Sequence, residues 1–280
     1  MKQYEELMFR DDFMFGKVME DVNLCRKVLE RLMQYDIGEL VTPMREHEVK
    51  FTQDGKSIRL DIYTEDVESN TIYDAEMQNL NKKRIEYYSL PKRSREYQSM
   101  IDMDQLLKGT SYRKLKDSKV IFICTFDPFG RGLYKYSFEE NCIEDESLSL
   151  NDGTSKIFYN TTSEALDIPN DIKLLFEYIN DGKPRDTLTD EIDIAVDIAR
   201  KNKEWGSAYM KSVTILDDVR EEGREEGREE GREEGREEGR EEGREETLVA
   251  STQKLARFLR EHGRLSEEEA EVKAKEILNN

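Results

Sequence analysis

The feature that most constrains this chain is a tandem repeat, REEG, which runs from Arg220 to Glu246 without a single apolar residue. A period of four residues drifts about 40° per repeat around a helix, so it forms no stripe that a core can bury. Glu and Arg three residues apart favour a helix by roughly a few tenths of a kcal/mol per pair, whereas the glycine of each unit opposes it by about 1 kcal/mol. The pattern predicts a marginal helix or a charged, extended spacer, and any globular core must lie outside it.

The formal net charge of −19 lies almost entirely in the second half of the 280-residue chain. Residues 1–138 contain 23 Lys and Arg against 24 Asp and Glu, so residues 139–280 carry a net charge of −18. A nearly neutral amino-terminal part can approach a polyanion where its basic residues cluster, but the acidic remainder would resist this. No apolar segment approaches the roughly 20 residues that span a bilayer, and no signal-peptide core is visible at the N-terminus, so we expect a cytoplasmic protein that does not bind membranes.

Apolar periodicity predicts an α/β fold before the repeat. Residues 12–35 have the period of one amphipathic helix, and HEVKF, SIRLDIY and TIYDAEM then read as three short strands with a period near two. A helical stretch over 82–107, interrupted at Pro91, precedes VIFICTF (120–126), an apolar run typical of a strand buried on both faces. The order helix, three strands, helix, strand indicates a mixed sheet flanked by helices.

The pattern weakens beyond residue 138. Residues 133–138 and 156–161 read as a further hairpin or as edge strands, and 170–180 and 188–204 read as helices. The expected organisation is a core (1–140), an α-rich extension that includes this edge hairpin (141–212), the repeat spacer (213–246) and a small helical tail (247–280) with a stop at Gly263 and a cap at Ser266. Binding of a protein partner, or of a second copy of the chain, is one use that such a tail would allow.

Two acidic residues on the predicted second and third strands suggest a metal site. In SIRLDIY and TIYDAEMQ, period two allows Asp61 and Glu76 to project from one face if the strands form a hairpin. Two carboxylates so close repel each other unless a cation lies between them, and Mg²⁺ prefers such oxygen ligands while keeping several waters. Gln78, on the same face as Glu76, could orient an attacking water. The alternative is that all three are ordinary solvated positions on exposed strand faces.

A basic segment follows directly. Residues 82–95 carry six Lys or Arg against one acid, Glu86. Basic side chains beside paired acids are what a phosphodiester-cleaving site needs, because they hold the backbone that the metal attacks. The candidate residues for binding the DNA backbone are Lys82, Lys83, Arg84, Lys92 and Arg93.

The spacing of these acids resembles the PD-(D/E)XK nuclease superfamily, in which a strand carboxylate is followed by Glu-x-Lys on the next strand. More specifically, the chain resembles the Rpn-type recombination-promoting nucleases, also described as putative transposases. Five blocks in the family's order carry the likeness: DDFMFGKVMED (11–21), RLDIYTED (59–66), IYDAEMQ (72–78), KRSREYQSMIDMDQLLKG (92–109) and VIFICTFDPFGRGLYKYSF (120–138).

The resemblance implies a restriction-endonuclease-like core that cleaves DNA with Mg²⁺ or Mn²⁺ and acts in recombination or on mobile elements. Asp61 and Glu76 would then be the metal ligands, with Gln78 in place of the family's final Lys. Supporting roles would fall to Asp12 on the first helix and to Arg95 and Gln98 in the fourth block. Gln cannot stabilise developing charge as an ammonium does, so a nuclease-like protein that binds DNA or protein without turnover is the alternative function.

Overall fold

The protein is described here by a computed structural model that covers residues 2–49, 58–79, 89–263 and 266–278. The chain divides into two compact units, Met1–Met210 and Lys211–Asn280. Unit 1 contains two apolar clusters, one on each side of a sheet, and unit 2 contains a third, much smaller one.

Unit 1 is built on a mixed sheet of six strands: β1 (Met44–Val49), β2 (Ile58–Asp66), β3 (Thr71–Gln78), β4 (Asp117–Cys124), β5 (Lys135–Phe138) and β6 (Thr154–Asn160). The strand order is β1-β2-β3-β4-β6-β5. The first three strands pair antiparallel, β3, β4 and β6 pair parallel, and β5 pairs antiparallel with β6. The prediction of an α/β fold with a mixed sheet is therefore confirmed.

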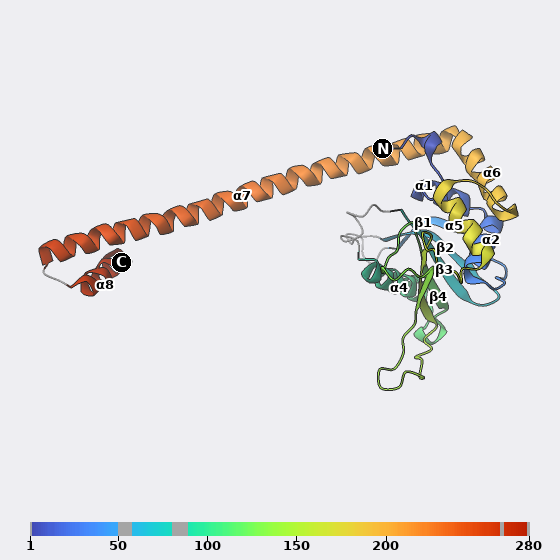
Figure 1. Cartoon of the computed structure of the whole chain (residues 1–280), viewed down its shortest axis with the longest axis horizontal. Helices are drawn as coiled ribbons and strands as arrows, with labels where there is room; N and C mark the ends of the chain where they lie inside the picture. The colour runs from blue at the N-terminus through green and yellow to red at the C-terminus, as the bar shows by residue number, and fades with distance from the viewer. Residues whose placement is uncertain (1, 50–57, 80–88, 264–265, 279–280) are drawn as a thin grey trace. The chain divides into compact units, whose positions relative to one another are not determined.

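Helices cover both faces of this sheet (Figure 1). One face, which includes Ile62, Ala75 and Ile121, packs against η1 (Tyr4–Glu6), α1 (Asp12–Met19), α2 (Val22–Met33), α5 (Asn170–Asp181) and α6 (Thr187–Lys201). The other face packs against α4 (Leu90–Leu107) through Tyr97 and Ile101, and the short η2 (Tyr112–Lys114) follows α4. Alternate residues of β3 therefore enter different apolar clusters, and all eight of its residues are buried.

The continuous helix expected over residues 12–35 is wrong, because the structure has two helices there. Helix α1 ends at Met19, and α2 begins after Asp21. The carboxylate of Asp21 accepts hydrogen bonds from the backbone N–H groups of Asn23 (2.9 Å) and Leu24 (3.1 Å). This is an N-cap, and it satisfies donors that a new helix would otherwise leave unpaired. The apolar period continues through the break because both helices pack on the same cluster.

The sheet continues past residue 140, where the core was expected to end. The further hairpin expected over 133–138 and 156–161 is confirmed, because β5 pairs antiparallel with β6. Strand β5 lies at the edge of the sheet, whereas β6 lies between β4 and β5, and Ile157, Phe158 and Tyr159 are buried. The N-terminal segment and α6 are also tied together. The hydroxyl of Tyr4 donates to the carbonyl oxygen of Ala199 at 2.6 Å, and Nε of Arg200 donates to the carbonyl oxygen of Leu7 at 2.8 Å. Unit 1 is thus completed by residues near position 200.

Helix α7 (Lys203–Gly263) contains the boundary between the units and the whole REEG repeat, so the repeat is helical. The end of α7 packs against α8 (Glu267–Leu278) through Ala256, Ala270 and Ala274. Ser266 caps α8, because its hydroxyl oxygen accepts a hydrogen bond from the backbone N–H of Glu269 at 3.4 Å. The packing of α7 on α8 confirms the predicted helical hairpin. None of the helices in the described part of the chain combines the length and apolarity needed to cross a membrane.

Removing three REEG units, residues 224–235, should leave the melting temperature of unit 1 unchanged, because the side chains described in this segment are all exposed. An exposed segment buries no apolar surface, so its removal takes away no hydrophobic stabilisation. Differential scanning calorimetry of the shortened and full-length chains measures this directly. A drop of several degrees in the unit 1 transition would mean that the repeat packs against unit 1.

Candidate functional site

Asp61 and Glu76 lie side by side where β2 and β3 meet, and each is bonded to the other's strand. Oε1 of Glu76 accepts a hydrogen bond from the backbone N–H of Asp61 at 2.7 Å. In return, Oδ2 of Asp61 accepts one from the backbone N–H of Met77 at 3.2 Å. Glu76 is buried, with 1% of its surface exposed. The two acids singled out from the sequence are therefore brought together, and these reciprocal bonds fix both carboxylates.

The alternation of side chains along β2 is interrupted at Asp61. Leu60 and Tyr63 both enter the apolar cluster under α4, while Ile62 enters the cluster on the opposite face. Strict period two would put residues 60 and 63 on opposite faces. The paired segment of β2 and β3 begins at Ile62 opposite Ala75, so the backbone just before it is free to turn its polar groups toward the carboxylates. Irregular strand positions of this kind commonly re-aim a side chain at a site.

In the part of the chain that the structure describes, Arg93 of α4 places a cation against Glu76 and Gln78. Its Nη2 lies 3.6 Å from Oε2 of Glu76, and its Nη1 donates to Oε1 of Gln78 at 3.0 Å. Nη2 also donates to the hydroxyl of Tyr97, whose ring lies beneath the guanidinium at 5.2 Å. The sequence assigned Arg93 to the DNA backbone, whereas the structure places its guanidinium against Glu76 and Gln78.

Burial and the charges of neighbouring acids raise the pKa of both Asp61 and Glu76. For Asp61, burial is the largest cause, the charges of Glu76 and Asp12 raise the pKa further, and the Met77 N–H and Arg93 lower it. For Glu76, burial is again the largest cause and the charge of Asp74 raises the pKa further, whereas the hydrogen bond from the Asp61 N–H and the charge of Arg93 lower it. The two carboxylates therefore resist being charged together, which is the condition that a bound cation relieves.

Asp74 is a third acid at this site that the sequence reading did not select. It is completely buried, two residues before Glu76 on β3, and neither of its oxygens has a hydrogen-bond partner among the described residues. Burial raises its pKa well above the ordinary range, the charge of Asp61 raises it further and Arg93 lowers it. An available signal was its position, because Asp74, Glu76 and Gln78 alternate in TIYDAEMQ and so share a face.

The other candidate residues differ in how they relate to Asp61 and Glu76. Asp12 begins α1 and acts electrostatically on both Asp61 and Glu76. Gln98 is buried and donates to Ser118 at 2.6 Å instead of contacting the acids. On α4, Lys92 and Arg95 are exposed. The remaining candidates, Lys82, Lys83 and Arg84, lie outside the described residues.

The donor set fits a hydrated divalent cation. In the described part of the chain, no three His, Cys, Asp or Glu side chains are grouped so that they could hold a metal ion together. Asp61 and Glu76 would hold it as a pair with water completing the shell, which is how Mg²⁺ usually binds. The unpartnered oxygens of Asp74 support this fit, because a buried carboxylate without hydrogen bonds is costly.

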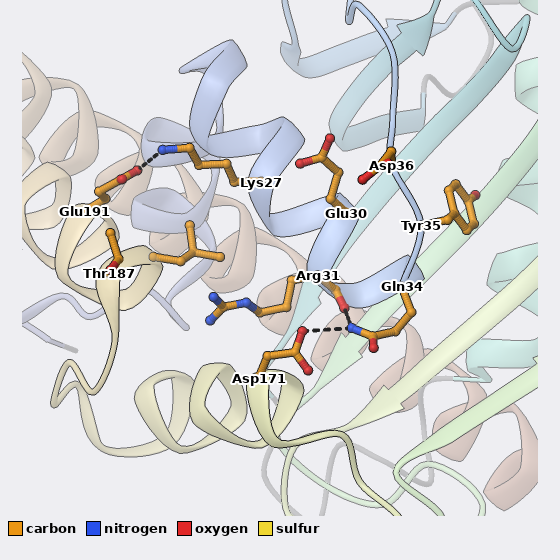
Figure 2. Close-up of a pocket in the computed structure, with 10 residues that line it drawn as sticks. Lys27, Glu30, Arg31, Gln34, Tyr35, Asp36, Asp171, Thr187 and Glu191 are labelled. Atoms are coloured by element: carbon orange, nitrogen blue, oxygen red, sulfur yellow. Dashed lines mark hydrogen bonds and ion pairs between the residues drawn. The ribbon is translucent and has the colours of Figure 1, made fainter.

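A separate hollow of about 490 Å³ lies among α2, α5 and α6 (Figure 2). Its polar side chains are engaged with one another across the helices. Nζ of Lys27 is 2.5 Å from Oε2 of Glu191, and Nε2 of Gln34 donates to Asp171 at 2.9 Å (Figure 2). It contains none of the acids described above, and its paired charges indicate a bridge between helices rather than a reacting site.

Wild-type protein without added cation should lose stability with rising pH more steeply than Glu76→Gln. A carboxyl with a raised pKa binds more protons in the folded than in the unfolded state. The stabilisation that Glu76 contributes is therefore complete below its pKa of about 4.3 in the unfolded chain, and it is lost as the pH rises through its pKa in the folded protein. Urea unfolding across acidic to mildly alkaline pH measures the slope. Glu65→Gln, on β2 outside the site, should keep the wild-type slope. Equal slopes for wild type and Glu76→Gln would contradict the raised pKa.

Compared with known proteins, the chain matches no family model, no curated protein and no solved structure. Function depends on the chemistry of a site more than on the fold that carries it, and the site here is built on Asp61 and Glu76.

Proposed function

We propose that the protein is a metal-dependent DNA endonuclease with a restriction-endonuclease-like core, linked to recombination or mobile elements. The observation that carries this proposal is the pair formed by half-buried Asp61 and buried Glu76, each hydrogen-bonded to the backbone of the other's strand, with Arg93 placed against Glu76. The likeness of five ordered sequence blocks to the Rpn-type nucleases supports the same activity.

Asp61 and Glu76 would hold Mg²⁺ or Mn²⁺. When bound, the ion polarises a phosphoryl oxygen and lowers the pKa of an attacking water. The task of the two acids is to offer oxygen ligands in a fixed arrangement, and their bonds to the Met77 and Asp61 N–H groups provide it. Preorganised groups of this kind need no rearrangement at the moment of reaction.

Gln78 and Arg93 together would replace the lysine of the superfamily motif. Oε1 of Gln78 accepts from Arg93, which leaves the amide nitrogen as a donor toward a water or a phosphate oxygen. The guanidinium supplies the positive charge that the amide lacks, from α4 instead of β3. Arginine is well suited to this because its planar fork matches phosphate oxygens and stays charged.

DNA would be held by its phosphates. Lys92 and Arg95 are exposed on α4, the helix that carries Arg93. Lysine and arginine contacts of this type bind the backbone without reading its sequence and weaken as salt rises. We therefore expect binding with little sequence preference.

The alternative is a protein of this fold that binds DNA or protein without turnover, and the presence of Gln78 in place of lysine favours it. A nicking assay on supercoiled plasmid separates the two. The full-length chain is incubated with plasmid and Mg²⁺, with Mn²⁺, or with chelator alone. Conversion to open circles that requires the divalent cation supports the endonuclease. Retarded plasmid without any nicking under all three conditions would support the binding protein.

A further inference from the structure

Asp74 lies in this site but has no role in the cleavage proposed above. Its side chain is completely buried on β3, on the face that also carries Glu76 and Gln78. Both of its oxygens lack a hydrogen-bond partner among the described residues. Nearly all buried polar groups in proteins are paired with protein, water or an ion, so two unsatisfied oxygens on one carboxylate indicate a missing partner.

The charges around Asp74 indicate what that partner is. Asp74 shares its face of β3 with Glu76, whose Oε1 accepts a hydrogen bond from the backbone N–H of Asp61 at 2.7 Å. Among the described residues, Arg93 approaches these acids, with its Nη2 3.6 Å from Oε2 of Glu76. A hydrated divalent cation is a further partner that suits buried carboxylate oxygens. However, the three carboxylates do not converge on one point that an ion could occupy, within the ranges the structure covers. A direct bond from Asp74 to the same ion as the other two acids is therefore disfavoured.

We propose that Asp74 is a positioning residue whose carboxylate accepts hydrogen bonds from water molecules carried by a divalent cation that Asp61 and Glu76 hold. This inference rests on the cation site of the proposed function. Mg²⁺ and similar ions keep much of their water in proteins, and acceptors for that water orient the ion and strengthen its binding. Asp74 satisfies its two oxygens in this way, and the ion acquires a fixed hydration shell beside Gln78.

The test compares Asp74→Asn with wild type in full-length protein, by calorimetric titration with Mn²⁺ and by thermal unfolding in chelator. Asn has nearly the same shape but carries no charge and can accept through only one oxygen. We expect Asp74→Asn to weaken Mn²⁺ binding about 10-fold, as the loss of an outer partner of a metal site typically does. In chelator, its melting temperature should not fall below that of wild type, because neither oxygen of Asp74 has a hydrogen bond among the described residues that the substitution would remove.

Asp66→Asn is the matched control, because Asp66 is also buried in the β2–β3 hairpin. Its carboxylate accepts from the Gly38 N–H at 3.1 Å and from the Ser69 hydroxyl at 2.8 Å. Asp66→Asn should lower the melting temperature and leave Mn²⁺ affinity unchanged, which is the reverse of the result expected for Asp74→Asn. If destabilisation of the protein were the cause of weaker Mn²⁺ binding, Asp66→Asn would also bind Mn²⁺ more weakly.

Three results would overturn the proposal. Unchanged Mn²⁺ affinity in Asp74→Asn, with normal binding by wild type, would remove Asp74 from the site and leave the proposed nuclease intact. Loss of binding as complete as in Asp61→Asn would make Asp74 a direct ligand instead. Absence of Mn²⁺ binding by wild-type protein would remove the cation site itself, and with it both this inference and the metal-dependent activity.

Discussion

Asp61→Asn is expected to reduce cation-dependent nicking of plasmid DNA by roughly 1,000-fold while DNA binding persists or tightens. The substitution keeps the size of the side chain but removes one of the two charges that would hold the ion. Metal activation contributes several kcal/mol to reactions of this type, and about 1.4 kcal/mol corresponds to a factor of ten in rate. DNA binding should not suffer, because one less carboxylate repels the phosphates less. Single-turnover cleavage and a gel-shift titration in chelator measure the two effects separately.

Glu65→Gln is the control for this result. Glu65 lies on the same strand as Asp61 and pairs with Lys116 outside the site, so its neutralisation should leave cleavage within a few-fold of wild type. Thermal unfolding of both variants in chelator shows whether β2 has remained folded. If Asp61→Asn is well folded and cleaves at the wild-type rate, Asp61 is not a metal ligand.

Arg93→Met should destabilise the protein in chelator by roughly 3 kcal/mol, because removing one partner leaves the buried carboxylate of Glu76 without its compensating charge. Added Mn²⁺ should restore part of this loss, since an ion that binds only the folded state stabilises it. Cleavage should also fall steeply, because the guanidinium supplies positive charge beside Gln78. Urea unfolding with and without Mn²⁺, followed by the nicking assay, gives these quantities.

Lys92→Met is the matched control, because Lys92 is the preceding residue of α4 and is exposed. It should weaken DNA binding slightly and leave the unfolding free energy in chelator unchanged. Adding Gln78→Lys to Arg93→Met should recover part of the cleavage rate, because an ammonium then replaces the lost guanidinium. An Arg93→Met variant as stable and active as wild type would assign Arg93 to the surface.

The sequence was sufficient to predict the strands and the neighbouring acids. Alternation in SIRLDIY and TIYDAEM is a local signal, and the hairpin that it implies brings Asp61 against Glu76. The sequence also predicted the helical hairpin at the C-terminus, because the stop at Gly263 and the cap at Ser266 are local features.

What the sequence left open depends on contacts between distant segments. Arg93 reaches Glu76 only because α4 packs across β2 and β4, so its residue type alone suggested the DNA backbone. Asp74 could be placed on a face but not recognised as unpartnered, since that requires knowing every neighbour. The helix break at Asp21 was hidden because the apolar period runs through it. Strand β6 could not be placed inside the sheet, because its position depends on pairing with both β4 and β5.

The position of β6 determines when the sheet of unit 1 can first be completed during synthesis. A chain emerging from the ribosome presents β1 to β5 before β6 exists, so β5 has no strand to pair with and β4 has one open edge. The contacts of Tyr4 and Leu7 with α6 must wait still longer, until Ala199 and Arg200 have emerged. Segments so far apart in sequence pair slowly and late. We therefore expect nascent chains that end near residue 140 to be open, protease-sensitive and inactive, although they contain every acid of the site. The proposed cleavage would therefore have to wait until the whole of unit 1 has been made.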